Sequence, residues 1–223
     1  MLGNIFILGD SYSTFEGYVP EGYGIYYNAE GPAYTKSNPD LNLNEGDVCD
    51  VTHTWWYNLV NETGTLIRNC SWSGTTICNT GYGGCDNSDK SFIARIEKLM
   101  KDGYFDRNKV DTLFVFGGTN DSWSDAPIGE PIYDGWTRND LYCVLPAFSY
   151  LLEVLTKNLT QTKIYCIINT ELKSEISSFY KSACQKYSVD YIELHDVDKV
   201  CGHPTKKGMS SIRQQILDYI IKR

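Results

Sequence analysis

Ser11 and His203 are the residues whose types could carry out acyl-transfer chemistry. Ser11 stands in Gly9-Asp10-Ser11, directly after a short apolar run, and His203 precedes Pro204 near the C-terminus. A serine hydroxyl attacks an acyl carbon readily only when a base takes its proton, and an imidazole can do this near neutral pH. The two residues therefore predict a nucleophile and its general base, provided that the fold brings them together.

Acyl transfer also places negative charge on the carbonyl oxygen, and this charge needs preorganised hydrogen-bond donors. The sequence offers three candidates for such an oxyanion hole: the backbone amides of Ser11 and Gly74 and the side-chain amide of Asn120. Loss of one oxyanion donor typically lowers a rate about 100- to 1000-fold. Asp10 is expected to hydrogen-bond across the loops and hold them in place.

Each of these residues also has a purely structural interpretation. Ser11 could cap a helix, Gly74 could serve a turn, and Asn120 could do either. His203 could be a solvated loop residue, and His195 competes with it as the base. Their joint occurrence favours chemistry, and it requires a fold that brings distant segments together.

Short apolar runs alternate with helical patterns along the chain. Five runs predict strands buried on both faces: Asn4–Leu8, Thr65–Asn69, Val110–Phe116, Lys163–Asn169 and Asp190–Leu194. Apolar periodicity predicts helices at about Phe92–Met100, with Ser88 or Asp89 as N-cap, and at Asp140–Lys157, Glu171–Tyr187 and Lys207–Lys222. Strands separated by helices predict a parallel sheet covered on both faces.

A parallel sheet places the carboxyl ends of its strands at one edge, where ligands bind in open α/β folds. Ser11 and Gly74 follow the first and second predicted strands, and Asn120 follows the third. His203 comes after the fifth strand. We therefore expect all four residues to converge at this edge.

Four blocks of the sequence resemble the SGNH (GDSL-like) hydrolase superfamily. They are Ile7-Leu8-Gly9-Asp10-Ser11, Asn69-x-x-x-Ser73-Gly74, Gly118-Thr119-Asn120-Asp121 and His203-Pro204. The resemblance extends from Ile5 to about Met209. It implies a flavodoxin-like, three-layer α/β/α sandwich with a five-stranded parallel sheet in the order 2-1-3-4-5. It also implies hydrolysis of esters or related acyl bonds without a cofactor, and no metal site is expected.

The chain departs from this superfamily at one place. The family usually has an aspartate three residues before the histidine, and here that position is Val200. An acid there fixes the imidazole tautomer and stabilises the imidazolium. Asp198 or Asp196 could take over this role, or a backbone carbonyl could do so and leave a Ser-His dyad.

The bulk composition excludes several classes of partner. The formal net charge is −8, which argues against a general affinity for nucleic acid or anionic membranes. No leader or membrane span is evident, so a cytoplasmic protein without stable membrane association is expected. The eight cysteines are expected to be reduced, although Cys70, Cys78 and Cys85 could pair or bind a soft metal. The oligomeric state stays open.

Residues 1–223 are expected to form one hydrolase domain with two aromatic-rich insertions, near residues 16–52 and 122–139. Loops of such length are usually functional, and most of their aromatic side chains, from Tyr18 to Tyr34 in the first, are expected to pin the loops to the body. The leading hypothesis is a serine esterase that forms an acyl-enzyme on Ser11.

Short-chain esters of a small molecule or a carbohydrate are the expected substrates, acetyl esters above all, because flat aromatic rings stack on sugar faces. A lipase, lysophospholipase or thioesterase is the alternative within the same superfamily. A non-catalytic carbohydrate-binding domain and an acyltransferase are the alternatives from other classes. Val200 keeps the first of these alternatives open, because no acid stands at that position.

Overall fold

The computed structural model describes residues 1–33 and 47–222. A five-stranded parallel sheet forms its centre, with the strands in the spatial order β4-β1-β5-β6-β7. These strands are β1 Gly3–Gly9, β4 Gly64–Ser71, β5 Thr112–Phe116, β6 Lys163–Ile168 and β7 Asp190–Glu193. Counted along the chain, the order is 2-1-3-4-5, which confirms the predicted topology.

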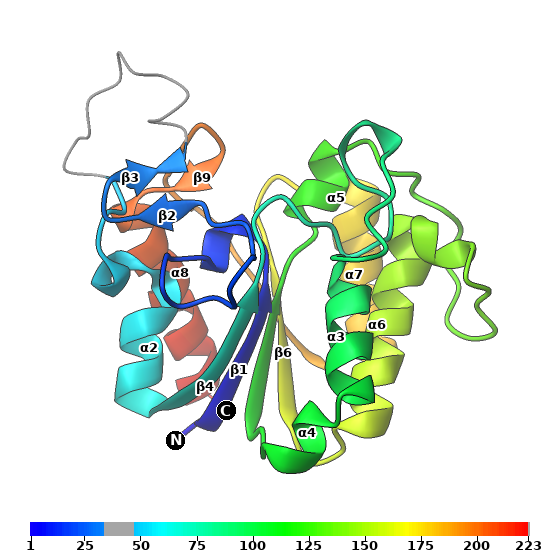
Figure 1. Ribbon diagram of the computed structural model, residues 1–223, viewed down its shortest axis with the longest axis horizontal. Coiled ribbons are helices and arrows are strands. Elements are labelled where there is room, and N and C mark those ends of the chain that lie inside the picture. Colours follow the sequence, from blue (N-terminus) through cyan, green and yellow to red (C-terminus); the bar gives the residue numbers. More distant parts are fainter. Residues whose placement is uncertain (34–46, 223) are drawn as a thin grey trace.

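Helices cover both faces of the sheet (Figure 1). On one face lie α2 (Trp55–Thr63) and α8 (Lys206–Ile221), and on the other lie α3 (Phe92–Lys101), α6 (Val144–Asn158) and α7 (Ser174–Lys186). Two apolar cores result, one on each side of the sheet. The central strand β5 is buried along its whole length, as expected for a strand covered on both faces. The predicted three-layer α/β/α architecture is confirmed.

Helix α3 begins at Phe92, as its apolar pattern predicted, but the predicted N-cap at Ser88 or Asp89 is wrong. Ser91 caps this helix, because its side chain accepts a hydrogen bond from the backbone amide of Ala94. Ser88 instead lies in a preceding turn, where its amide donates to Asp86 Oδ1. The capping bond thus forms at the serine nearest to the first apolar residue of the helix.

Two other helices begin later than their predicted starts at Asp140 and Glu171. The pattern that starts at Asp140 is broken at Cys143, whose backbone is extended (φ −106°, ψ 143°), and α6 follows it. Pro146 fits this start because the first turn of a helix does not need its N–H. Helix α7 begins at Ser174, since Glu171 has a φ of +65° that no helix can contain.

Short elements connect the main ones. They are the 3₁₀ turns η1 Ser11–Ser13, η2 Val51–His53, η3 Tyr82–Gly84 and η4 Asp140–Tyr142, the helices α4 Tyr104–Arg107 and α5 Thr119–Trp123, and the strands β2 Tyr27–Asn28, β3 Gly31–Pro32, β8 Lys199–Val200 and β9 His203–Pro204. The hairpins β2-β3 and β8-β9 lie side by side above α2 and α8 in Figure 1, and the hydroxyl of Tyr27 donates to the backbone oxygen of Pro204.

The first insertion is described only in part, because residues 34–46, with Tyr34, lie outside the described residues. Described aromatic residues of both insertions attach the loops to the helices by ring contacts, as expected. Tyr18 packs on Trp56 of α2, and Tyr133 packs on Phe179 of α7. All eight cysteines are free thiols. In the described ranges, no helix is long and apolar enough to cross a membrane, and no cluster of three or more His, Cys, Asp or Glu side chains could hold a metal ion.

Candidate active site

Ser11 opens the turn η1 directly after β1, at the carboxyl edge of the sheet. Its side chain is nearly buried, with 3% exposed, and its Oγ lies 2.9 Å from Nε2 of His203. Asp10 caps the turn by accepting a hydrogen bond from the amide of Tyr12, rather than bridging to another loop as expected. The fold thus joins a serine and a histidine that are 192 positions apart in sequence.

His203 lies on the short strand β9, which pairs with β8 in an antiparallel hairpin. The chain then enters α8, whose N-cap is Thr205, since its side chain accepts a hydrogen bond from the amide of Gly208. The start of the last helix after Pro204 agrees with the sequence interpretation. The hairpin that precedes it was not predicted.

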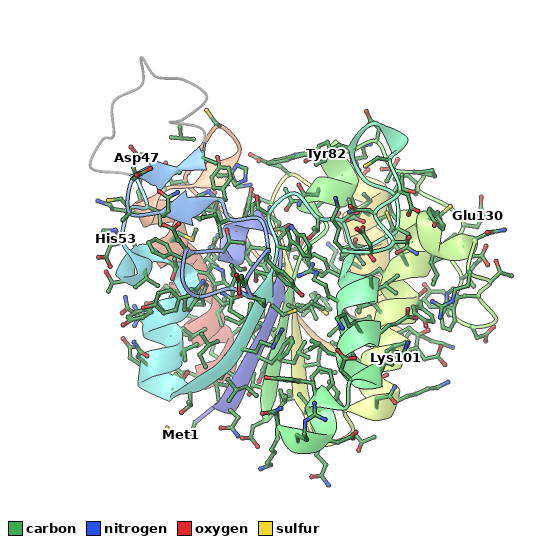
Figure 2. All side chains as sticks on the ribbon, in the orientation of Figure 1. Met1, Asp47, His53, Tyr82, Lys101 and Glu130 are labelled. Carbon is green, nitrogen blue, oxygen red and sulfur yellow. The ribbon has the colours of Figure 1, made fainter. Side chains whose placement is uncertain are left out.

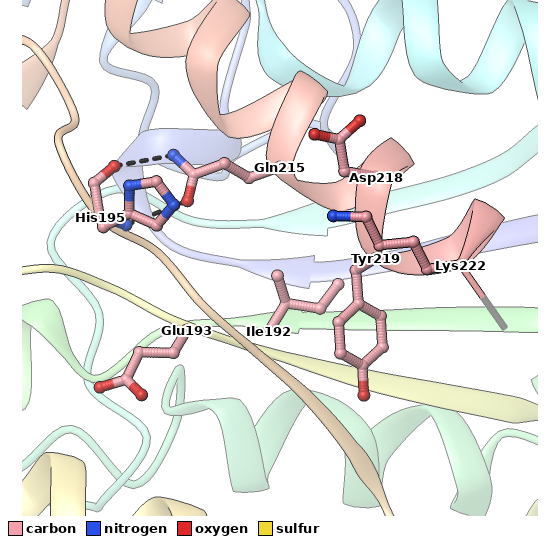
Figure 3. A pocket seen from close by; sticks show the side chains of 7 residues that line it. All are labelled: Ile192, Glu193, His195, Gln215, Asp218, Tyr219 and Lys222. Carbon is pink, nitrogen blue, oxygen red and sulfur yellow. Dashed lines mark hydrogen bonds between the residues drawn. The ribbon is translucent and has the colours of Figure 1, made fainter.

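His195, the competing candidate for the base, does not lie beside Ser11. Figure 3 shows it in a surface hollow between β7 and α8, where Gln215 hydrogen-bonds to its backbone. Its imidazole is 74% exposed and contacts Asp196 Oδ2 at 3.1 Å. Ser11 is not among the residues that line this hollow. The geometry therefore favours His203 as the partner of Ser11.

A backbone carbonyl orients the His203 imidazole. Its Nδ1 lies 3.2 Å from the carbonyl oxygen of Cys201. A carbonyl oxygen can only accept a hydrogen bond, so this contact places the ring proton on Nδ1 and leaves Nε2 free to accept the proton of Ser11. Cys201 and Gly202 have φ values of +49° and +74°, which turn the chain sharply enough for this contact.

The two aspartates upstream are engaged elsewhere. Asp198 accepts a hydrogen bond from the hydroxyl of Thr205, and Asp196 lies beside His195. Val200, at the position where the family usually has an acid, stands opposite the histidine in the hairpin and is 37% exposed. Of the alternatives for the orienting group, the structure has the backbone carbonyl.

Three aromatic side chains surround the His203 ring. Tyr26 stacks on it, with ring centroids 3.6 Å apart and an angle of 9° between the planes. Tyr12 and Trp123 pack against it with centroids at 5.3 Å and 5.8 Å. Burial is the main cause that lowers the pKa of His203 to about 4, and Lys199 nearby acts in the same direction. The imidazole is therefore neutral at neutral pH, as a general base must be.

Two tyrosine hydroxyls fix the backbone on either side of His203. Tyr12 donates to the carbonyl oxygen of Gly202, and Tyr27 donates to that of Pro204 at 3.0 Å. Both tyrosines belong to the N-terminal segment that also carries the nucleophile. The position of the histidine is thus tied to the loop of the serine by direct hydrogen bonds.

The three candidate oxyanion donors lie in the loops that follow β1, β4 and β5 at the carboxyl edge of the sheet. Asn120 is 3% exposed on α5, and its Nδ2 donates one hydrogen bond, of 2.9 Å, to the carbonyl oxygen of Thr75. Gly74 has a φ of +76°, which glycine tolerates better than other residues. Among the described residues, the backbone amides of Ser11 and Gly74 have no hydrogen-bond acceptor. These amides and the second N–H of Asn120 are available to an oxyanion.

Arg95 on α3 is a part of the site that the sequence interpretation missed. Its side chain is buried, and its guanidinium donates to the backbone oxygens of Gly9, at 3.0 Å, and of Cys70. It also donates to Oγ1 of Thr75 at 3.1 Å. The acceptors lie at the ends of β1 and β4 and directly after Gly74, so one side chain joins two of the loops that build the site.

Two carboxyl groups, those of Asp10 and Asp121, are buried in the reactive loops and lie near each other. Asp121 accepts hydrogen bonds from the amides of Ile77 and Cys78 at 2.9–3.1 Å and so holds the second loop against α5. Burial raises the pKa of Asp121, and it raises the pKa of Asp10 to about 7, partly opposed by Arg95. A carboxyl next to the nucleophile thus changes its charge near neutral pH.

Comparisons with known proteins agree with the geometry. A family model described as GDSL-like Lipase/Acylhydrolase matches residues 3–220. The structure is similar to crystal structures described as GDSL-like lipases from Bacteroides ovatus (42% identity, TM-score 0.87, 100% of both chains) and Bacteroides uniformis (43%, 0.86, 99% of this chain and 96% of that one).

A more distant likeness shows the fold alone. It is to an active-site mutant of a family two carbohydrate esterase from Clostridium thermocellum, with 13% identity and a TM-score of 0.62. That comparison covers 99% of this chain and 64% of the other. No curated protein matched the sequence.

Proposed function

The chain belongs to the GDSL-like lipase/acylhydrolase family, and we propose that it is a serine esterase that works through an acyl-enzyme on Ser11. Its class, a carboxylic-ester hydrolase, follows from the family. The mechanism is supported above all by the 2.9 Å contact between Ser11 Oγ and His203 Nε2, with the ring proton on the other nitrogen. We also propose that residues 1–223 act as one hydrolase domain.

In the acylation step, Ser11 Oγ attacks the ester carbonyl carbon while its proton moves to His203 Nε2. The former carbonyl oxygen becomes an oxyanion, which the amides of Ser11 and Gly74 and the side chain of Asn120 hold. When the intermediate collapses, the bond to the alcohol oxygen breaks. The proton on the imidazole then passes to the leaving alcohol, and the acyl group stays on the serine.

Deacylation reverses the roles, with water as the nucleophile and His203 again as the base. The imidazolium that forms in each half-reaction has no carboxylate partner among residues 1–33 and 47–222. Its Nδ1 proton is held by the carbonyl oxygen of Cys201, and the face of Tyr26 lies over the ring, where a π-system stabilises positive charge. The catalytic unit proposed here is therefore a Ser-His dyad.

The proposed substrates are short-chain esters, acetyl esters above all, of a small molecule or a carbohydrate. Two exposed aromatic side chains flank the site: the hydroxyl of Tyr82 contacts Asn120, and the Trp123 ring packs edge-on against His203. Exposed rings beside a reactive serine suit the flat face of a sugar. A protein described as a carbohydrate esterase shares this fold, so the fold is compatible with the same substrate class.

Turnover of p-nitrophenyl acetate tests the proposal. Wild type is expected to hydrolyse this ester, and Ser11→Ala is expected to lose activity by at least about a thousandfold, as for other serine hydrolases without their nucleophile. Ser182→Ala is the matched control, because Ser182 is exposed on α7 and bonds only within its helix. Mass spectrometry after treatment with a fluorophosphonate should find the label on Ser11. Equal activity of the Ser11→Ala variant and wild type would refute the mechanism.

A further inference from the structure

A glycine-rich loop between β4 and α3 places a tyrosine hydroxyl on the side chain of Asn120. The loop contains Gly81-Tyr82-Gly83-Gly84, and the hydroxyl of Tyr82 donates a 2.9 Å hydrogen bond to Asn120 Oδ1. We propose that Tyr82 is a positioning residue of the oxyanion hole, which fixes the orientation of the Asn120 amide and strengthens its N–H as a donor. This inference rests on the proposed function.

The two contacts of Asn120 define which end of its amide faces which neighbour. Its oxygen can only accept, and it lies on the hydroxyl of Tyr82; its nitrogen can only donate, and it lies on the carbonyl oxygen of Thr75. Rotation of the amide by 180° would bring its oxygen against the Thr75 oxygen, acceptor against acceptor. With both neighbours in place, the second N–H of Asn120 is the hydrogen left for an acyl oxygen.

A donor on the amide oxygen also acts on the amide nitrogen. Hydrogen bonds in a chain polarise one another, so a hydroxyl that donates to Oδ1 makes the N–H at the other end a better donor. Partial burial raises the pKa of Tyr82 to about 12, and Asp10 and Asp121 act in the same direction. The hydroxyl therefore keeps its proton and remains a donor throughout the pH range in which an esterase is assayed.

The loop that carries Tyr82 is held in place at several points. The amide of Gly81 donates to the carbonyl oxygen of Cys85 at 2.8 Å, and the hydroxyl of Thr80 donates to that of Tyr142 at 2.7 Å. Gly83 and Gly84 have φ values of +65° and +73°, which only glycine adopts at little cost. The tight turn they form explains the glycines of this motif, which contains no phosphate-binding pattern.

Tyr82 can be changed with little risk to the fold, because 45% of its surface is exposed. Figure 2 shows it at the end of the molecule toward which the sheet strands run. Tyr82→Phe keeps the ring and removes only the hydroxyl. Tyr18→Phe is the matched control, since Tyr18 is 39% exposed, packs on Trp56 through its ring and has no hydroxyl contact to a described residue.

The experiment measures kcat and KM for p-nitrophenyl acetate in wild type, both tyrosine variants, Asn120→Ala and the double variant Tyr82→Phe/Asn120→Ala. Tyr82→Phe should lower kcat about threefold to tenfold, the range for loss of one neutral hydrogen bond. KM should stay within about twofold and the melting temperature unchanged, since the effect belongs to the transition state. In the Asn120→Ala background, the same change should have no further effect.

Three outcomes would overturn the inference: an unchanged kcat in Tyr82→Phe, an effect on KM alone, or an equal loss of kcat in both backgrounds. If the kcat of Asn120→Ala is as low as that of Ser11→Ala, the double variant cannot show a further loss. The comparison of kcat between Tyr82→Phe and Tyr18→Phe then tests the inference. The proposed function fails separately, through a Ser11→Ala variant that remains active. A Ser11-dependent wild type with an unaffected Tyr82→Phe variant would contradict only the role of Tyr82.

Discussion

His203 is held by aromatic rings and a backbone oxygen where related enzymes use a carboxylate. The Tyr26 ring lies flat on the imidazole at 3.6 Å and removes water from one of its faces. This burial lowers the pKa of His203 to about 4. The same ring that keeps the base neutral at rest also offers its electron-rich face to the imidazolium during turnover. Tyr26 thus acts on both protonation states.

Replacement of Tyr26 should change both the rate and its pH dependence. In wild type, the acid limb of kcat/KM is expected near pH 4, since kcat/KM reports the ionisation of the free enzyme. Tyr26→Ala lets water reach the imidazole, so the limb should move upward toward 6.5, the value of a solvated histidine. Loss of the stack should also lower kcat by about 2- to 30-fold.

Tyr26→Phe serves as the control because it keeps the stacked ring, and its pH profile should match wild type. The measurement is kcat/KM for p-nitrophenyl acetate between pH 3.5 and 8, with stability checked at each pH. An acid limb at the same pH in wild type and Tyr26→Ala would show that the ring does not set the pKa of the base.

At the scale of elements, α3 connects the apolar core to the reactive loops. Its apolar residues Phe92, Ile96 and Leu99 are buried, and Arg95 lies among them on the same face. The guanidinium also packs over the Phe92 ring, with the carbon 4.4 Å from its centroid. A charged residue at a core position of an amphipathic helix is a signal that sequence reasoning can use. It indicates buried acceptors, which here are the loop carbonyls.

Arg95→Met should destabilise the protein strongly, because the carbonyl oxygens of Gly9 and Cys70 lose a buried donor. We expect a fall in the free energy of unfolding of about 2–4 kcal/mol, measured by urea denaturation. Arg213→Met is the control, since Arg213 pairs with the half-exposed Glu62 on the surface, where a pair contributes less than about 1 kcal/mol. Equal losses in the two variants would contradict the role given to Arg95.

Elements with a strong local pattern could be predicted from the sequence, and short ones could not. All five sheet strands were found because each is a short segment rich in apolar, β-branched or aromatic residues. The expected burial on both faces holds for the central strand β5, whereas the edge strands β4 and β7 are only partly buried. The hairpin of Lys199–Val200 and His203–Pro204 was missed because two-residue strands have no periodicity. The break at Cys143 was missed because the apolar pattern runs across it, and only Pro146 indicates where α6 begins.

The candidate site was predictable where it follows the strands. The contact of Ser11 with His203 could be expected from parallel topology, as could the contact of Asn120 with the loop that carries Gly74. The orienting group of His203 could not, since a backbone carbonyl is present at every residue and only the turn at Cys201 aims one at the imidazole. The stack of Tyr26 depends on the path of a loop, which leaves no mark in the spacing of residues.

At the scale of the whole molecule, stability and charge are linked through Asp10. Its carboxyl is buried beside the nucleophile, and burial raises its pKa to about 7 from the 3.8 of an exposed aspartate. A group with a raised pKa binds its proton more tightly in the folded state. Its contribution to stability is therefore fully present below pH 4 and is lost as the pH rises through 7.

Asp10→Asn should remove this pH dependence and keep the capping contact, because an asparagine oxygen can still accept from the amide of Tyr12. The stability of wild type relative to the variant should fall by roughly 2–4 kcal/mol between pH 4 and pH 8. His203 has the opposite slope, since its pKa is lowered, but it titrates equally in both proteins. Urea denaturation at several pH values gives the difference in the free energy of unfolding between the two proteins. If this difference does not change with pH, the raised pKa of Asp10 is disproved.

Side chains make the contacts between the hairpin that carries His203 and the described segments that come before it in the chain. They are the hydroxyls of Ser11, Tyr12 and Tyr27, the rings of Tyr26 and Trp123, and the ammonium of Lys199. In the part of the chain that the structure describes, no backbone ladder ties this hairpin to the five-stranded sheet at whose edge Ser11 lies. Local opening of the hairpin therefore breaks side-chain contacts and no ladder of the central sheet, so we expect it to need less free energy than global unfolding. On warming, His203 should separate from Ser11 while both cores remain intact. Esterase activity should therefore be lost at a lower temperature than the one at which the protein unfolds.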